Sequence, residues 1–156
     1  MATRKKPKKA QETFCSYVIE ILNCCPEYSF SLGHDSYEGP HSEHAIINGG
    51  GKFVIPERLA GQPVKISIFG DRSLAQHLED TKKPMHFEPL AVAHVEYGRG
   101  RSEAWMSVPF DALPIILQGL NAGNLQYADL YGDHLRHRKA RIRRFSLKPE
   151  INLEDY

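Results

Sequence analysis

The sequence predicts a mostly β, α+β fold: an antiparallel sandwich or a partly closed barrel of short strands, with one amphipathic helix packed against it. Three observations favour this class. Short runs of β-branched and aromatic residues recur along the chain and predict strands. The segments between them are too short for the crossovers of a doubly wound parallel sheet. Only residues 111–121 show strong helical periodicity, so helix is expected to be a minor component.

The chain length and composition favour one domain. A chain of 156 residues has the length of a typical domain and can bury a sizeable core. We expect residues 1–12 to form a disordered basic tail. Residues 13–148 then form a single globular β-rich domain, and residues 149–156 are expected to be a loose acidic C-terminus.

The first part of the domain predicts two separate strands. Residues 14–22 are rich in β-branched and aromatic side chains, and Asn23 and Pro26 end this run. Residues 28–32 alternate apolar with small polar side chains, which is typical of a strand with one buried face. A loop rich in glycine, histidine and acidic residues follows.

A glycine-rich run predicts a β-hairpin. Residues 45–47 and 53–55 flank the segment 48–51, whose glycines can adopt the positive φ angles of a tight turn. The next strand is predicted at residues 64–69, where apolar and polar side chains alternate again. Residues 72–80 predict a short helix.

The second half predicts another hairpin before the helix. Residues 90–97 and 102–108 form its strands, and the turn between them exposes Arg99 and Arg101 at its tip. Two last strands are predicted at residues 125–131 and 138–147, around a turn at Gly132 and Asp133. The total is about nine strands.

The helix is predicted from its termini and its apolar face. Asp111 is placed to cap the first amides, and Gly123 is placed to end the helix. The apolar face consists of Leu113, Ile116, Leu117 and Leu120. This spacing predicts that the helix packs against the sheet along one side.

The net charge of +1 hides a division along the chain. Residues 4–9 carry five positive charges, and residues 136–144 carry six. Residues 10–135 hold 8 Lys or Arg against 16 Asp or Glu. This asymmetry indicates a charged partner, or contacts between the basic ends and the acidic middle of the same chain or of a second copy.

The basic segment near the C-terminus is the strongest candidate for a binding site. On a strand, Arg141 and Arg143 share one face while Ile142 points inward, and the adjacent Arg144 breaks the alternation and indicates a β-bulge. Guanidinium groups suit phosphate and carboxylate ligands. The predicted binding residues are Arg99, Arg101, Arg136, Arg138, Lys139, Arg141, Arg143 and Arg144. Two structural explanations remain open: a charged edge strand that resists aggregation, or ion pairs with the acidic remainder.

The histidine-rich loop is a weak candidate for a metal site. Its imidazoles are those of His34, His41 and His44. Their spacing matches no metal signature, and on a strand His41 and Glu43 would face away from His44. We therefore predict no metal site, no cofactor and no catalytic residue. A metal-dependent enzyme that uses this loop is a distant third hypothesis.

The cysteines and the start of the chain favour an intracellular protein. Cys15, Cys24 and Cys25 form neither a disulfide framework nor a zinc signature, and the first residues resemble no signal peptide. We expect a cytoplasmic protein without membrane contact, or a nuclear one if the host has a nucleus. The first functional hypothesis is a small interaction or adaptor domain whose basic segments bind a protein partner, a second copy or a polyanion. The alternative is a nucleic-acid-binding module.

Overall fold

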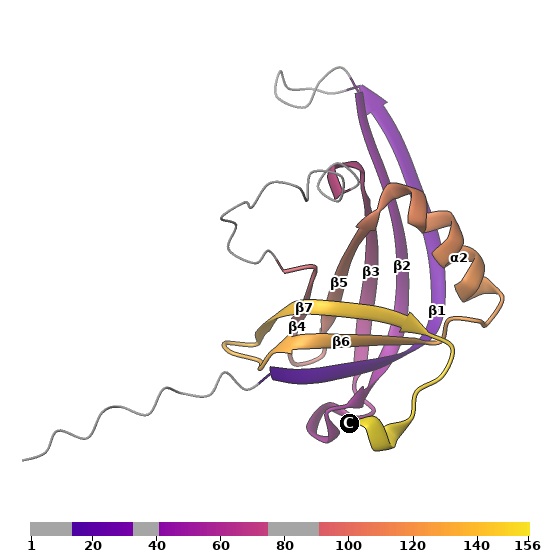
Figure 1. Cartoon of the computed structure of the whole chain (residues 1–156). Helices are drawn as coiled ribbons and strands as arrows, with labels where there is room; N and C mark the ends of the chain where they lie inside the picture. Colours follow the sequence, from indigo (N-terminus) through magenta and orange to yellow (C-terminus); the bar gives the residue numbers. More distant parts are fainter. Residues whose placement is uncertain (1–13, 33–40, 75–90) are drawn as a thin grey trace, which may run out of the picture.

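A computed structural model describes residues 14–32, 41–74 and 91–156 of the chain. In these residues one sheet closes into a barrel with the strand order β1-β2-β3-β5-β4-β7-β6, and β1 pairs with β6 to complete the circle (Figure 1). The strands are β1 (Phe14–Leu32), β2 (His41–Ile55), β3 (Pro63–Asp71), β4 (Ala93–Glu96), β5 (Glu103–Pro109), β6 (Tyr127–Asp133) and β7 (Lys139–Lys148). The predicted mostly β class is therefore confirmed.

Every pair of neighbouring strands in the described sheet is antiparallel except β3 and β5. These two run parallel, with Ile66 opposite Ala104. The chain leaves β3 at Asp71 and passes through β4, which pairs with the other side of β5, before it returns. The long connection makes this one parallel pair compatible with a fold that is otherwise built from short links.

The barrel interior is filled by side chains that alternate along the strands. Inward residues from all seven strands form one continuous core, because alternate Cβ atoms of a strand point to the same side. The largest fully buried side chains are those of Tyr17, Phe53, Ile19, Ile68, Met106, Leu130, Ile142, Val18 and Val95.

The prediction of a hairpin turn at residues 48–51 is wrong, because this run lies in the middle of the single long strand β2. Its glycines permit close approach between strands. A Cβ at Gly49 would overlap the carbonyl oxygen of Asn23, and a Cβ at Gly51 would overlap that of Glu20. None of these glycines has a positive φ angle. They mark the place where β2 and the neighbouring β1 bend together.

The two strands predicted at residues 14–22 and 28–32 also form one strand, β1. β1 keeps pairing with β2 across the interruption, with a register shift between Ile21 and Asn23. The side chain of Asn23 accepts a hydrogen bond from the Gly50 amide at 2.9 Å, so the polar residue supports the bend. These two mergers reduce the nine predicted strands to seven.

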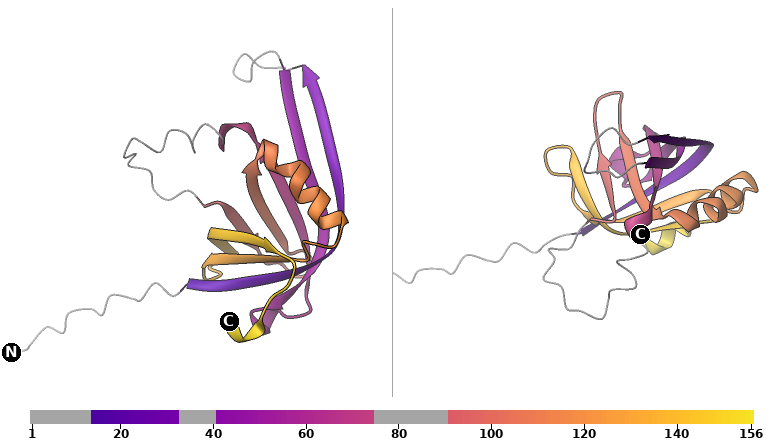
Figure 2. Two further views of the ribbon diagram at one scale, coloured as in Figure 1. Left: turned by 45° about the vertical axis from the view of Figure 1, so that its right-hand side comes forward. Right: turned by 90° about the horizontal axis from the view of Figure 1, so that it is seen from above.

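β1 and β2 extend beyond the barrel as a two-stranded ribbon, which we call the arm. It consists of residues 28–32 of β1 and 41–45 of β2, which pair only with each other in the described sheet. β3 accompanies β2 only as far as Ile46, and β6 accompanies β1 only as far as Glu20. Figure 2 shows the arm projecting away from the other strands.

The predicted helix is α2 (Leu113–Asn121), preceded by a short 3₁₀ turn, η2 (Phe110–Ala112). Asp111 does not cap it: the capping position belongs to Ala112, and the 3₁₀ turn places Asp111 before it. Gly123 ends the helix as predicted, with a positive φ of 70°. Its amide bonds Leu120 O at 3.1 Å while the Asn124 amide bonds Gly119 O at 2.9 Å, the Schellman arrangement.

The apolar face of α2 packs onto the core of the barrel. Leu113 is buried, and Ile116, Leu117 and Leu120 are partly buried against the same core. Figure 1 shows the helix crossing beside the strands from which the arm rises. The sequence periodicity therefore identified both the helix and its buried side.

Two further hairpins are present, and one turn differs from the prediction. β4 and β5 are antiparallel and joined across residues 97–102, as expected. The β6–β7 turn comes later than predicted, because Gly132 and Asp133 belong to β6 and the chain reverses over residues 134–138. A Cβ at Gly132 would overlap the carbonyl oxygen of Arg141, so this glycine also serves close strand packing.

The C-terminal segment folds back toward β7. It contains a short 3₁₀ turn, η3 (Leu153–Asp155), which is capped by the side chain of Asn152. A similar turn elsewhere in the chain, η1 (Glu57–Leu59), follows β2. Lys148 Nζ donates to Asp129 Oδ2 at 2.6 Å and to the Tyr156 hydroxyl at 3.4 Å.

Some predictions fall outside the described residues: the basic tail 1–12, His34, Leu90 and most of the helix at 72–80. In the part of the chain that is described, no helix has the length and hydropathy needed to cross a membrane.

Candidate functional site

The basic strand β7 has the geometry that its sequence predicts. Arg141 and Arg143 are exposed, while Ile142 between them is 0% exposed and lies in the core. The bulge is also confirmed. Arg144 pairs with Tyr131 and Ile142 pairs with Gly132, so Arg143 is the extra residue.

β7 pairs with β4 over residues 139–142 and with β6 over residues 142–148. On the β4 side, β7 therefore has no strand partner in the described sheet beyond Ile142. Protection of this open edge still explains the charges of Arg143 and Arg144, whereas Arg141 lies where β4 is paired. All three arginines project from the barrel surface.

Ion pairs explain part of this charge. Asp133 accepts a bond from Arg141 Nε at 3.2 Å and lies 3.7 Å from Arg143 Nε, and Lys139 Nζ lies 3.5 Å from Glu96. The side chains of these three cations keep exposures of 68%, 43% and 71%. Exposed ion pairs stabilise a fold by roughly 0–1 kcal/mol each. The prediction of ion pairs is thus confirmed, but the pairs leave the cations accessible.

A hollow of about 360 Å³ opens beside these groups. It is lined by Phe14, Asp133, His134, Arg136, Lys139, Arg141 and Arg143. The side chains come from the start of β1, the end of β6, the β6–β7 turn and the first half of β7. We call this hollow, together with the adjacent Tyr131 and Arg144, the basic surface.

Two aromatic rings belong to the basic surface. The centroids of Phe14 and Tyr131 are 5.6 Å apart. The guanidinium carbon of Arg143 lies 4.5 Å from the centre of the Phe14 ring, and that of Arg144 lies 5.3 Å from the Tyr131 ring. These are distances of cation–π contact. Neither ring could be assigned to this surface from the sequence, because their positions depend on the register between β1, β6 and β7.

The described chain begins beside the basic surface. β1 begins at Phe14, which pairs with Asp133, so the chain segment before Phe14 joins the barrel here (Figure 1). Lys9 precedes Phe14 by five positions, and a chain spans at most roughly 3.3–3.6 Å per residue. The lysines of residues 4–9 are therefore tethered within reach of β7.

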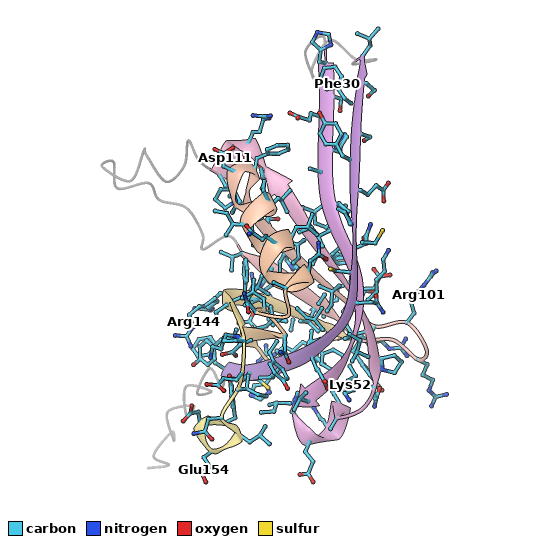
Figure 3. All side chains as sticks on the ribbon, turned by 90° about the vertical axis from the view of Figure 1, so that its right-hand side faces the viewer. Phe30, Lys52, Arg101, Asp111, Arg144 and Glu154 are labelled. Carbon is cyan, nitrogen blue, oxygen red and sulfur yellow. The ribbon has the colours of Figure 1, made fainter. Side chains whose placement is uncertain are left out.

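The remaining predicted binding residues divide between two places. Arg136 and Arg138 lie in the β6–β7 turn, where Arg138 has a positive φ of 69°. Arg101 lines a different, open hollow of about 620 Å³ together with Lys65 and Glu103. Figure 3 shows Arg101 and Arg144 on opposite sides of the molecule. Arg99 is exposed in the same turn as Arg101.

The structure describes two of the three histidines of the weak metal candidate, His41 and His44. Their side chains do not point toward a common site. His41 pairs with Leu32 and stacks on Phe30 with a centroid distance of 5.3 Å. His44 lies on the opposite face of the arm, 2.8 Å from the hydroxyl of Ser42. Within residues 14–32, 41–74 and 91–156, no group of three or more His, Cys, Asp or Glu side chains is arranged to hold a metal ion.

A third hollow, of about 530 Å³, lies at the base of the arm. Arg72 Nε donates to Glu43 at 2.7 Å, and its guanidinium carbon lies 4.2 Å from the centre of the Phe110 ring. The hydrogen bond from Arg72 lowers the pKa of Glu43. The Tyr28 hydroxyl donates to the same carboxylate at 3.0 Å, which raises the pKa of Tyr28. The Arg72–Glu43 bond ties the arm to the residue that follows β3, and the Tyr28–Glu43 bond joins the two strands of the arm.

Of the three hollows, the first combines the most cationic side chains with aromatic contacts. No family model matches the chain, and neither the curated proteins nor the solved structures contain a significant match to it. The chemistry of the basic surface is therefore the ground for assigning a function.

Proposed function

We propose that the protein is a binding module for a polyanion, and that the basic surface takes single-stranded nucleic acid. The observation that carries this proposal is the pairing of arginines with aromatic rings, Arg143 on Phe14 and Arg144 on Tyr131, beside a cationic hollow. Surfaces that bind single strands combine a positive groove for the phosphates with aromatic or guanidinium planes for the bases.

The charge supports the same ligand. The basic surface has Asp133 as its carboxylate and five cations from the turn and β7: Arg136, Lys139, Arg141, Arg143 and Arg144. Residues 4–9, which carry five positive charges, precede Phe14 in the sequence by five to ten positions, and Phe14 lies at this surface. Phosphate contacts by Lys and Arg release counterions, so the affinity should fall steeply as the salt concentration rises.

A second candidate is an adaptor that binds an acidic protein segment. The ion pairs of Asp133 and Glu96 with Arg141, Arg143 and Lys139 favour it, because these cations already accept carboxylates as neighbours. The aromatic rings favour nucleic acid over this alternative, since an acidic peptide offers the guanidinium planes no base to stack on.

The test is fluorescence anisotropy with labelled single-stranded 20-mers and with a polyglutamate peptide of equal charge, at roughly 50 and 200 mM salt. We expect the wild type to bind the 20-mers. The logarithm of its association constant should fall linearly with the logarithm of the salt concentration, with a slope of about −0.7 per phosphate contact. The double variant Arg141→Glu, Arg143→Glu should bind at least about tenfold more weakly. Its free energy of unfolding should fall by no more than about 1–2 kcal/mol, because each of the two exposed ion pairs with Asp133 contributes roughly 0–1 kcal/mol.

The matched control is Lys65→Glu, Arg101→Glu, which makes the same charge change at the other hollow. We expect it to retain most of the affinity. An equal loss in both double variants would show that only net charge matters. Binding of polyglutamate in preference to the single-stranded 20-mers would favour the adaptor, and no binding of either polymer at low salt would overturn the proposal.

A further inference from the structure

The arm carries a row of exposed apolar side chains. Tyr28, Phe30 and Leu32 alternate along β1 and therefore share one face, and they are 61%, 60% and 69% exposed. The Phe30 side chain is visible near the outer end of the arm in Figure 3. Isolated two-stranded ribbons are marginally stable in water, and three or more strands with an apolar face are needed for independent stability.

The β1 side of the arm is also an open sheet edge. In the described sheet β6 pairs with β1 only up to Glu20, and no strand lies beyond β1 at residues 28–32. Natural edge strands are protected by charged residues, proline or bulges. Residues 28–32, Tyr-Ser-Phe-Ser-Leu, contain no charge and no proline, so this edge is a surface suited to the addition of a strand.

We propose that this edge is paired with the same edge of a second copy of the chain. An antiparallel pair with its twofold axis at Ser29 places Tyr28 of each copy opposite Phe30 of the other. Glu27 then faces Ser31, so no like charges meet. The two arms form a four-stranded sheet in which both apolar rows lie on one face, and the symmetric interface closes on itself.

The other edge of the arm does not offer the same complementarity. Residues 41–45 of β2 carry the charge of Glu43, and charged side chains are one of the features that protect natural edge strands from pairing. Glu43 is also held by Arg72 and Tyr28. The β1 edge is therefore the one that favours self-association.

Sedimentation equilibrium of the purified full chain over roughly 1–200 µM tests the interface. We expect a reversible monomer–dimer equilibrium in the wild type. Replacing Phe30 and Leu32 together by Lys should raise the dissociation constant at least about tenfold, because it adds charge to a desolvated strand pair. The control Ile115→Lys changes an apolar side chain of α2 that is 72% exposed, and it should leave the equilibrium unchanged.

A cross-link tests the register. Paired Cα atoms of antiparallel strands lie about 4.5–5.5 Å apart, a separation that a disulfide spans. In a chain whose Cys15, Cys24 and Cys25 are replaced by Ala, Ser29→Cys should form a disulfide-linked dimer on mild oxidation, whereas Ser107→Cys on β5 should not. A wild type that stays monomeric at every concentration would overturn the proposal. A dimer that persists in the double Lys variant, or that fails to cross-link at position 29, would do the same.

The β1 edge of the arm is separate from the proposed nucleic-acid site. Arg141 and Arg143 lie on the barrel, and their Glu variant should sediment like the wild type. The two proposals can therefore fail independently.

Discussion

The same two strands build two regions with opposite environments. In the barrel, β1 buries Tyr17 and Ile19 completely, and β2 buries Phe53. In the arm, β1 exposes Tyr28 and Phe30, residues of the same kinds. The two regions differ in the number of strands. In the barrel, the inner face of each strand is enclosed by six other strands, whereas the arm consists of two strands only. Residue type favours a strand, but only the neighbouring strands decide whether its side chains are buried.

The largest expected difference between the regions is in unfolding free energy. Phe53→Ala removes a ring that is 1% exposed and leaves a cavity, so we expect a loss of about 3–5 kcal/mol. Phe30→Ala removes an exposed ring and should change the free energy of unfolding by about 0.5 kcal/mol or less. Urea unfolding at a protein concentration that keeps the chain monomeric measures both. Equal losses would mean that Phe30 is covered within the monomer.

A smaller effect is expected where the barrel strands bend into the arm. In Gly51→Ala the new methyl group overlaps the Glu20 carbonyl oxygen and approaches Ile19 and Ile66, so we expect a destabilisation of about 1–3 kcal/mol. Gly50→Ala is the matched control. Its methyl group would lie 3.2 Å from the end of the Asn23 side chain and not against backbone, so we expect a smaller destabilisation than in Gly51→Ala.

Thermal unfolding of the two alanine variants gives the comparison. If Gly50→Ala lowers the stability as much as Gly51→Ala, the loss comes from reduced backbone flexibility of the strand. The close approach of β1 at Gly51 would then not be its cause.

The smallest effect concerns the contact that ties the arm to β3. The pKa of Glu43 is lowered mainly by the hydrogen bond from Arg72. A lowered pKa means that the contact stabilises the fold above the ordinary carboxyl pKa, near 4.3, and that this stabilisation is lost as pH falls through the folded-state value. In Arg72→Ala the pKa of Glu43 should rise.

Carbon NMR of the Glu43 carboxyl group during an acid titration measures this shift. The stability difference between wild type and Arg72→Ala should be present at neutral pH and should vanish below the folded-state pKa of Glu43. An unchanged Glu43 pKa in the variant would show that Arg72 does not hold the arm.

Much of the fold was predictable because it depends on local patterns. The period of apolar residues identified α2 and its packed face, and Gly123 marked its end. Alternation in β7 placed Ile142 inside and Arg141 outside, and the break at Arg143 and Arg144 identified the bulge. These features involve residues within a few positions of one another, so the sequence alone contains the information.

The predictions were wrong where one residue type is compatible with two different local structures. The glycines of residues 49–51 suit a turn, yet here they let two bent strands approach closely. Asn23 suits the end of a strand, yet its side chain bonds the Gly50 amide and supports a bend inside one. Asp111 suits a helix cap, but the chain reaches the helix through a 3₁₀ turn that places Ala112 at that position.

By itself, the sequence determined the strand-rich class, the amphipathic helix, the division of charge and the outward direction of Arg141. Only the tertiary structure decided that Phe14 and Tyr131 join the arginines, that Arg101 lies apart from them and that Phe30 stands uncovered on the arm. The physical reason is that strand pairing joins residues distant in sequence. Phe14 meets Asp133 only because β1 closes the barrel against β6, and no short-range pattern contains that register.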